Sequence, residues 1–318
     1  MTYRAADGSL HAGVVHPADP TMIVDVTSRL PQGEVGPMRR LITILHEGVS
    51  IDDLIGDCPV MRRPSVQVVA PVTDPTKVVA APVNYRNHQT EMKADCCIDA
   101  LGVFLKAPSS LVEHRGVIQL PYGDRRFDQE GEFAAVIGRT ARHVPEADAL
   151  NHVFGYTCLL DMTMRGGEDR SMRKSFDTFT PIGPTIVSRD EAPQIEDMQL
   201  RLWVNGVLRQ RAAISELIWS LPRLIAYASS VMTLVPGDIV TTGTPEGVGR
   251  VYDGDQLSLE VTGLDRLDAS VSTKGAMTCP TNGVRGGIPA AETFTAVTER
   301  IDREPQPSIP SVPNDIRG

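Results

Sequence analysis

The stretch that decides the fold lies at residues 128–138 and reads Asp-Gln-Glu-Gly-Glu-Phe-Ala-Ala-Val-Ile-Gly. Its second half is an apolar run that predicts a buried strand. Glu130 and Glu132 come just before this run, and residues i and i+2 of a strand point to the same face. Two carboxylates on one face repel each other unless a positive charge lies between them. The alternative is an exposed strand face with two solvated acids.

A second apolar run, Phe-Gly-Tyr-Thr-Cys-Leu-Leu at residues 154–160, ends at Asp161. Asp161 offers a third oxygen ligand to accompany Glu130 and Glu132. Three carboxylates without a soft ligand nearby suit a hard divalent cation such as Mg²⁺, with Mn²⁺ or Ca²⁺ as alternatives. The residues therefore predict a metal site formed by Glu130, Glu132 and Asp161.

The length and composition indicate a globular protein with a substantial core. The chain has 318 residues, of which 41% are hydrophobic, and a mean hydropathy of −0.11. No apolar run approaches the roughly 20 residues of a membrane span. The net charge of −9, without a Lys/Arg run, argues against nucleic acid as a partner. An odd count of five cysteines without metal-type spacing, and an N-terminus without a hydrophobic signal core, predict free thiols and a cytoplasmic location.

Changes of pattern along the chain predict three parts: a small N-terminal domain of strands, turns and short helices at 1–72, a main domain at 73–272, and a Pro-rich C-terminal arm at 273–318. The arm is expected to be poorly packed or to drape over a neighbouring subunit. The main domain shows many strands, few helices and no nucleotide-binding fingerprint.

Three local patterns within the main domain give sharper predictions. Asn205-Gly206 between two alternating runs predicts a β-hairpin. A 3.6-residue apolar period predicts a helix over 215–231 that Pro222 breaks in two. Residues 93–101 show no clear period and predict a mobile flap.

Several segments in order over residues 77–265 together resemble the fumarylacetoacetate hydrolase family. They read Asn-Tyr-Arg-Asn-His at 84–88, Phe-Leu-Lys at 104–106, Gln-Glu-Gly-Glu-Phe-Ala-Ala-Val-Ile-Gly-Arg at 129–139, Gly-Tyr-Thr at 155–157 with Asp161, Lys-Ser-Phe-Asp-Thr-Phe-Thr-Pro-Ile-Gly-Pro at 174–184, Val-Asn-Gly at 204–206 with Arg-Gln at 209–210, and Leu-Val-Pro-Gly-Asp-Ile-Val-Thr-Thr-Gly-Thr-Pro-Glu-Gly-Val-Gly at 234–249.

The resemblance implies an α+β fold, a β-rich mixed-sheet roll that is usually a homodimer. It also implies that Glu130, Glu132 and Asp161 bind Mg²⁺ or a similar ion. Family members act on 2-oxo acids, including acylpyruvates and oxaloacetate-like or muconate-derived diacids, in small-molecule catabolism that includes aromatic compounds. The helical His and Glu of the family match His88 and Glu91, and its active-site lysine matches Lys174.

This residue set supports a consistent chemistry. A metal held by three carboxylates leaves positions for two oxygens of a 2-oxo acid. Glu91 orients His88, which takes a proton from water. Lys174 offsets developing negative charge. Candidates for binding the substrate are Arg165, Gln210, Thr244 and Lys106.

Each of the following residues also has an interpretation without a role in catalysis or binding. His88 and Glu91 at i, i+3 are compatible with a surface pair, Lys174 with a solvated charge cluster, and Lys106 with a snorkelling strand lysine. The sequence also departs from the family pattern: Val83 precedes Asn-Tyr where a Gly is usual, and Gly166 stands where an Asp is frequent.

The leading hypothesis is a metal-dependent hydrolase that cleaves a C–C bond in an acylpyruvate-type β-diketo acid. A decarboxylase of an oxaloacetate-like diacid, or an isomerase of a muconate-derived one, is the alternative. The third hypothesis is a metal-binding protein without catalysis, suggested by the altered loop at 162–173.

Overall fold

The computed structural model describes residues 1–283 of the chain. The larger part of the predicted Pro-rich arm, residues 284–318, lies outside the described residues. Within them the chain forms a mixed-sheet, strand-rich fold with few helices, as the sequence predicts. Short 3₁₀ turns connect the elements at Thr27–Arg29, Arg63–Ser65, Pro108–Ser110, Glu146–His152, Ile195–Asp197 and Ile214–Glu216.

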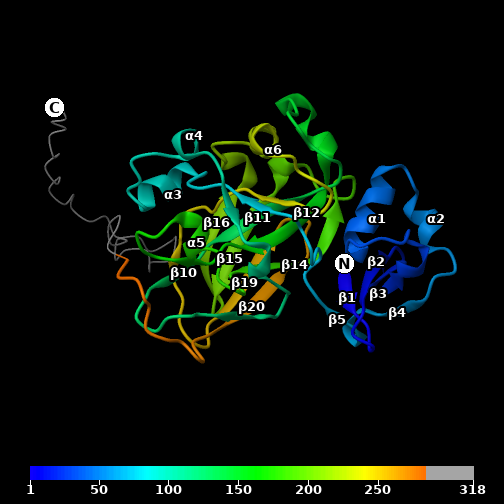
Figure 1. Cartoon of the computed structure of the whole chain (residues 1–318), viewed down its shortest axis with the longest axis horizontal. Coiled ribbons are helices and arrows are strands. Elements are labelled where there is room, and N and C mark those ends of the chain that lie inside the picture. The colour runs from blue at the N-terminus through cyan, green and yellow to red at the C-terminus, as the bar shows by residue number, and fades with distance from the viewer. Residues whose placement is uncertain (284–318) are drawn as a thin grey trace, which may run out of the picture.

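The first part of the chain, blue in Figure 1, forms an antiparallel five-stranded sheet in the order β4-β3-β2-β1-β5. Helix α1 begins at Pro37, a residue suited to a first helical turn because that turn's N–H groups have no partner in the helix. Its buried Leu41 and Ile42 join an apolar cluster that includes Val136 of the main body. The elements are β1 (Thr2–Arg4), β2 (Leu10–His16), β3 (Asp19–Asp25), α1 (Pro37–His46), α2 (Ile51–Ile55), β4 (Val60–Arg62) and β5 (Gln67–Val68).

A seven-stranded mixed sheet in the order β7-β6-β17-β11-β12-β14-β8 is the centre of the main body. Its strands are β6 (Val78–Ala80), β7 (Phe104–Lys106), β8 (Leu111–Val112), β11 (Gly131–Ile137), β12 (Val153–Leu160), β14 (Thr180–Ser188) and β17 (Ile239–Thr241). All residues of β11 are buried. Because both of its faces are covered, the strand reads as a continuous apolar run rather than an alternating one.

A five-stranded sheet, β16-β15-β19-β20-β9, packs against the seven-stranded sheet. Phe133, Ala135 and Ile137 of β11 share one apolar core with Leu202 of β15 and Leu259 of β19. The strands are β9 (Val117–Gln119), β15 (Gln199–Val204), β16 (Val207–Ala213), β19 (Gln256–Val261) and β20 (Leu267–Ser272). A small third sheet, β13-β10-β18, contains β10 (Phe127–Gln129), β13 (Thr163–Met164) and β18 (Gly249–Arg250).

The predicted hairpin is confirmed. β15 and β16 pair antiparallel across Asn205 and Gly206, whose φ angles are 51° and 78°. Two consecutive positive φ angles are the mark of a type I′ turn, whose twist matches that of the flanking strands.

One expectation about helices is wrong. Pro222 does not break a helix, because it lies in the first turn of α6 (Leu221–Val231), where its missing N–H costs no hydrogen bond. Within the predicted flap at 93–101, the last four residues form α4 (Ile98–Leu101), with Ile98 fully buried and Asp99 accepting a hydrogen bond from Nε1 of Trp219 at 2.6 Å. The mobility of the flap stays a prediction. The remaining helices are α3 (Arg86–Glu91) and α5 (Arg170–Arg173).

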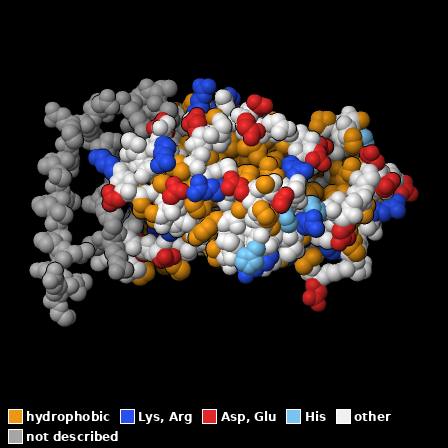
Figure 2. Space-filling view, turned by 90° about the horizontal axis from the view of Figure 1, so that it is seen from above, with side chains coloured by type: hydrophobic (Ala, Val, Ile, Leu, Met, Phe, Trp, Pro, Cys, Tyr) orange, Lys and Arg blue, Asp and Glu red, His pale blue; other side chains and the backbone are white. Residues whose placement is uncertain are grey.

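The surface between the N-terminal sheet and the main body is hollowed by a cleft of about 940 Å³. On the face shown in Figure 2, acidic and basic side chains are interspersed around hydrophobic ones. Among residues 1–283, no helix combines the length and apolarity needed to cross a membrane. The cysteines, all of which fall within this range, are all free thiols.

Candidate active site

The three predicted metal ligands lie together in the interior. Glu130, Glu132 and Asp161 are buried, and one carboxylate oxygen of each lies within 4.8 Å of the others. β11 and β12 pair antiparallel with Gly131 opposite Leu160, and the backbone N–H of Asp161 donates to the carbonyl of Glu130 at 2.8 Å. The strand pairing therefore brings Asp161 beside the two glutamates.

Glu132 differs from its two neighbours in its partners. Its Oε2 accepts hydrogen bonds from the Thr241 hydroxyl and from the Gly243 backbone N–H, the latter at 2.9 Å. Within the described part of the chain, no lysine or arginine nitrogen lies within ion-pair distance of it. Burial, together with the negative charge of Asp161, raises the pKa of Glu132 to about 8. This buried, oxygen-only set with an uncompensated carboxylate fits a hard divalent cation.

Two buried lysines reach Asp161. Nζ of Lys174 donates to Asp161 Oδ2 at 2.5 Å, Glu130 Oε2 at 2.7 Å and Thr163 Oγ1 at 2.7 Å. Nζ of Lys106 donates to Asp161 Oδ1 at 2.5 Å and to the carbonyl of Lys174 at 2.6 Å. Burial lowers the pKa of Lys106, although Asp161 opposes this. Neither lysine is a solvated or snorkelling residue.

Arg165 binds one carboxylate oxygen of Glu130, Oε1. Its Nη2 donates to Glu130 Oε1 at 2.8 Å, and its Nε donates to Asp128 Oδ2 at 2.7 Å. Although burial opposes it, Lys174 and Arg165 hold the pKa of Glu130 well below its ordinary value, and His88 contributes in the same direction. The site therefore keeps Glu130 ionised.

His88 and Glu91 lie on one face of α3, and the side chain of each is 6% exposed, so they are not a surface pair. Nδ1 of His88 is 3.2 Å from Glu91 Oε2. The carboxylate also accepts the backbone N–H of Gly247, at 3.0 Å to Oε1 and 3.2 Å to Oε2. Because an ionised carboxylate only accepts, this contact assigns the proton of a neutral imidazole to Nδ1 and leaves Nε2 as the accepting nitrogen. In the stretch from residue 1 to 283, Nε2 has no hydrogen-bond partner.

The start of α3 is anchored by Asn84, which is fully buried. Its Nδ2 donates to the carbonyls of Trp219 and Thr242, both at 2.9 Å, and its Oδ1 accepts the Trp219 N–H at 2.7 Å. The preceding Val83 has φ +46°, a left-handed conformation that is strained for a β-branched residue. Val83, which stands where the resemblance led us to expect a glycine, thus has a backbone conformation that favours glycine.

Gln210 and Thr244 lie beneath the glutamates and bind the backbone. Gln210 Oε1 accepts the Gly131 N–H at 2.8 Å, and its Nε2 donates to Thr244 Oγ1 at 2.8 Å. The Thr244 hydroxyl donates to the Gly131 carbonyl at 2.9 Å. These contacts hold the 243–249 segment against the glutamate-bearing strand, and the substrate contacts predicted for both side chains stay predictions.

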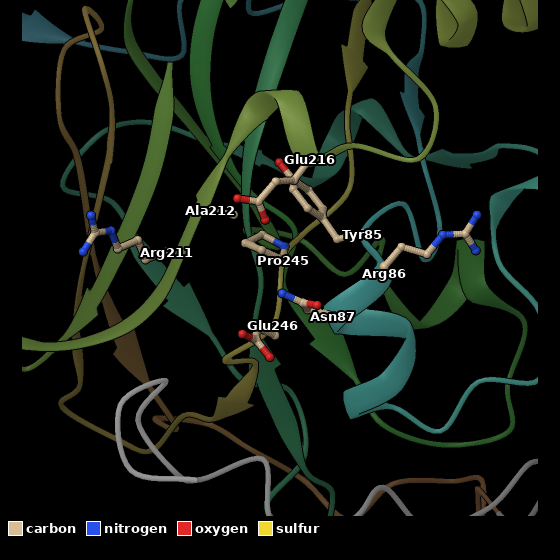
Figure 3. A pocket seen from close by; sticks show the side chains of 8 residues that line it. All are labelled: Tyr85, Arg86, Asn87, Arg211, Ala212, Glu216, Pro245 and Glu246. Carbon is tan, nitrogen blue, oxygen red and sulfur yellow. The ribbon is translucent and has the colours of Figure 1, made fainter. Parts of the chain in front are cut away.

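A cavity of about 290 Å³ lies beside α3, lined by Tyr85, Arg86, Asn87, Arg211, Ala212, Glu216, Pro245 and Glu246. In Figure 3, Asn87 points toward the Pro245–Glu246 backbone, whereas Arg86 points away from it. The Tyr85 hydroxyl is buried without a hydrogen-bond partner among the described residues, and burial raises its pKa, with a contribution from Glu132. The wall of this cavity is continuous with the backbone that holds His88 and Thr244.

Three residues of the site were missed from the sequence: Asp128, Thr163 and Thr241. Asp128 continues the i, i+2 alternation of Glu130 and Glu132, so that pattern held a signal for it. The two threonines come from β13 and β17, and no local pattern marks them.

Comparisons with known proteins identify the family of this chain. Residues 77–272 match the family model described as fumarylacetoacetate (FAA) hydrolase C-terminal. Maleylpyruvate hydrolase of Aquipseudomonas alcaligenes is 42% identical over 232 residues, covering 70% of this chain and 81% of the relative. The 4-hydroxyphenylacetate degradation bifunctional isomerase/decarboxylase of Escherichia coli is 40% identical over 190 residues, covering 58% of this chain and 44% of the relative.

A solved structure extends the similarity to the whole fold. Maleylpyruvate hydrolase from Sphingobium sp. SYK-6, in complex with manganese(II) and pyruvate, superposes with a TM-score of 0.73 at 36% identity. The match covers 86% of this chain and 98% of that one. The β-rich mixed-sheet roll expected from the sequence is therefore confirmed.

Proposed function

This chain belongs to the fumarylacetoacetate hydrolase family, and from this premise we propose that it is a divalent-metal-dependent hydrolase that cleaves a C–C bond in an acylpyruvate-type 2-oxo acid. The observation that carries the hydrolytic reaction is the buried His88–Glu91 pair, in which Nδ1 of His88 is 3.2 Å from Glu91 Oε2. Similarity to two maleylpyruvate hydrolases supports the substrate class.

Glu130, Glu132 and Asp161 would hold the ion, Mg²⁺ or Mn²⁺. An ion held by these carboxylates would supply Lewis-acid polarisation of the 2-oxo group and would offset the negative charge that develops as the C–C bond breaks. The manganese in the Sphingobium relative supports this choice. Arg165 keeps Glu130 ionised and fixes its orientation, and Lys106 fixes the orientation of Asp161.

His88 acts as the general base. Its Nε2 accepts a proton from a water molecule, whose oxygen attacks the distal carbonyl of the substrate. Glu91 stabilises the imidazolium that forms, and the Gly247 N–H fixes the carboxylate in place. The proton then passes to the carbon released as pyruvate, so the products are pyruvate and a carboxylic acid.

Lys174 is a buried cation of the site. Its ammonium group lies between Glu130 and Asp161, within reach of both, and stabilises negative charge on the substrate oxygens. Gln210 and Thr244 position the 243–249 segment that supplies the Gly243 and Gly247 N–H groups. The substrate contacts of Arg165, Lys106, Gln210 and Thr244 remain part of the proposal.

The protein acts, in this proposal, as a homodimer in the cytoplasm, in the breakdown of aromatic compounds. It has an N-terminal domain at 1–72, a catalytic domain at 73–272 and an arm at 273–318. β5 ends the first sheet at Val68 and β6 opens the central sheet at Val78, which supports a boundary between them. Light scattering on the purified chain measures the oligomeric state directly.

The test is a metal-supplemented screen of acylpyruvates, oxaloacetate and a muconate-derived diacid, with chelator-treated protein as the control. The proposal expects pyruvate and a carboxylic acid, formed only with Mg²⁺ or Mn²⁺. The relative from E. coli supports a second candidate, an isomerase/decarboxylase, which would release CO₂ or an isomer without consuming water. No turnover on any 2-oxo acid would indicate a metal-binding protein without catalysis.

A further inference from the structure

One arginine outside the site joins three segments that are distant in sequence. The guanidinium of Arg125 holds the Glu168 carboxylate through two hydrogen bonds, at 2.7 Å and 2.9 Å. It also donates to the Arg165 carbonyl at 3.0 Å, and to the carbonyl and hydroxyl of Thr281, both at 3.1 Å. Its side chain is only 9% exposed. The planar arginine guanidinium carries five N–H donors, more than any other side chain, and can therefore donate to several acceptors at once.

The loop that Arg125 holds leads directly to the carboxylates. It follows Asp161 and contains Arg165, whose side chain binds Glu130 and Asp128. Two adjacent glycines, Gly166 and Gly167, give this loop little stiffness of its own. The start of the loop is held by the pairing of β13 with β10 and by the Arg165 N–H, which donates to the Arg126 carbonyl at 2.8 Å. Beyond Arg165, the Arg125–Glu168 pair holds the loop through two hydrogen bonds.

Gly166 makes room for this contact. A Cβ added at Gly166 would lie 2.1 Å from Arg125 Nη2 and 2.2 Å from a Glu168 oxygen. A side chain there would have to displace the end of the Arg125 side chain, the Glu168 carboxylate or both. Gly166 therefore leaves the space that this ion pair occupies.

The third segment, residues 279–283, lies beyond the part of the chain that matches the family model, which ends at residue 272. The Thr281 hydroxyl donates to Glu168 Oε1 at 2.5 Å, and the Gly167 N–H donates to the Gly283 carbonyl at 3.1 Å. The Cys279 N–H donates to Asp124, the residue before Arg125, at 2.9 Å. The start of the C-terminal arm is therefore packed against the loop that reaches the site.

We propose that Arg125, with Glu168 and the 279–283 segment, is a positioning device that aligns Arg165 and through it Glu130 for the divalent ion. The inference rests on the proposed metal site. Ligand oxygens must be held within about half an ångström of their productive positions. Arg165 occupies Oε1 of Glu130, whereas Oε2 accepts from Lys174, which also donates to Asp161. Loosening the loop frees Glu130 to turn, which weakens metal binding.

The experiment compares full-length variants by their Mn²⁺ dissociation constants, measured calorimetrically and by electron paramagnetic resonance of free Mn²⁺. Arg125→Gln removes the guanidinium group, and Gly166→Ala crowds its contact with Glu168. Thr281→Val removes only the hydroxyl group through which the start of the C-terminal arm binds Glu168. The matched control is Arg63→Gln, which breaks another part-buried ion pair, with Asp265 at 2.6 Å. Arg125→Gln and Gly166→Ala should weaken Mn²⁺ binding by about 10-fold, and Thr281→Val by about 3-fold, whereas the control should bind as the parent does.

Activity provides a second readout. The loss of kcat/KM should appear at limiting Mn²⁺ and largely disappear at saturating Mn²⁺, a pattern that general destabilisation does not produce. Arg125→Lys should not restore binding, because a single ammonium group cannot serve both Glu168 and the Arg165 carbonyl.

Each alternative result has a definite meaning. A parent that does not bind Mn²⁺ removes the proposed function itself. A parent that binds Mn²⁺, together with Arg125→Gln and Gly166→Ala variants whose constants stay within about twofold of it, overturns the positioning role alone. Equal weakening in Arg63→Gln also overturns it. A parental constant in Thr281→Val overturns the contribution of the arm.

Discussion

Gly247 donates its backbone N–H to both carboxylate oxygens of Glu91, at 3.0 Å and 3.2 Å. Glu91 is the last residue of α3, and Gly247 lies in the glycine-rich segment after β17, so this contact joins elements that are 156 residues apart. The same carboxylate is 3.2 Å from Nδ1 of His88. A backbone group therefore sets the orientation of the proposed general base through its carboxylate partner.

Replacement of His88 by Gln should abolish most of the turnover while leaving the metal site intact. Gln keeps similar bulk but cannot accept the proton, so kcat should fall by about 10²- to 10⁴-fold. The Mn²⁺ dissociation constant should stay near the parental value, because His88 makes no hydrogen bond to the three carboxylates. Steady-state kinetics at saturating Mn²⁺, with calorimetry on the same sample, checks both. A parental kcat would rule out water activation by His88.

Replacement of Val83 by Gly should stabilise the protein. Val83 has φ +46°, which costs a β-branched residue about 1–2 kcal/mol. Glycine removes this strain but adds about 0.5–1 kcal/mol of chain entropy to the unfolded state. The expected net gain in the free energy of unfolding is about 1 kcal/mol, measured by urea denaturation. A loss of stability would show that the valine side chain contributes packing that outweighs the strain.

Replacement of Gly243 by Ala should weaken both stability and metal binding. Both Gly243, at φ +87°, and Gly254, at φ +83°, have left-handed conformations. A Cβ at Gly243 would lie 2.9 Å from the Ala81 carbonyl and 3.0 Å from Asn84 Cβ, whereas Gly254 has open space.

Gly254→Ala is therefore the matched control for the backbone strain alone, which is about 1–2 kcal/mol. Gly243→Ala should lose more than this and should also move the N–H that binds Glu132. Urea denaturation and Mn²⁺ titration of both variants test the difference. Equal losses in the two variants would mean that the crowding is relieved without disturbing Glu132.

Metal binding should release a proton below about pH 8. The pKa of Glu132 is raised from 4.5 to about 8 by burial and by the charge of Asp161, so in the metal-free protein its carboxyl group is protonated below that pH. The ion requires the carboxylate, so affinity should rise up to about tenfold per pH unit toward pH 8 and then level off. Calorimetry in two buffers of different ionisation enthalpy counts the protons. Glu132→Gln should lose this dependence together with most of its affinity.

The raised pKa of Glu132 predicts the opposite pH trend for the stability of the metal-free protein. A folded pKa above the unfolded one means that the folded state binds more protons between about pH 4.5 and about pH 8. The free energy of unfolding should therefore fall as the pH rises through this window. Urea denaturation of chelator-treated protein at about pH 5.5 and about pH 8 measures the change, and a rise over that window would contradict the assigned direction.

Local sequence patterns predicted much of the fold. Asn205-Gly206 predicted the hairpin because two adjacent residues that favour positive φ angles specify its turn type. The helix containing His88 and Glu91 followed from spacing, and the buried strand of Glu132 from its apolar run. Pro222 was misread because a proline inside a periodic stretch and a proline at the first turn of a shorter helix give the same local pattern.

What the sequence determined by itself is the chemistry of the site: three carboxylates for a hard cation, and a histidine with its carboxylate partner three residues later. Such features depend on side-chain type and on short spacings along the chain, and both can be read directly from the sequence. Only the tertiary structure decided which cation meets which carboxylate. The Lys106–Asp161, Arg165–Glu130, Glu91–Gly247 and Arg125–Thr281 contacts span 55, 35, 156 and 156 residues. Contacts at such separations are set by strand order and sheet packing, which no local pattern encodes.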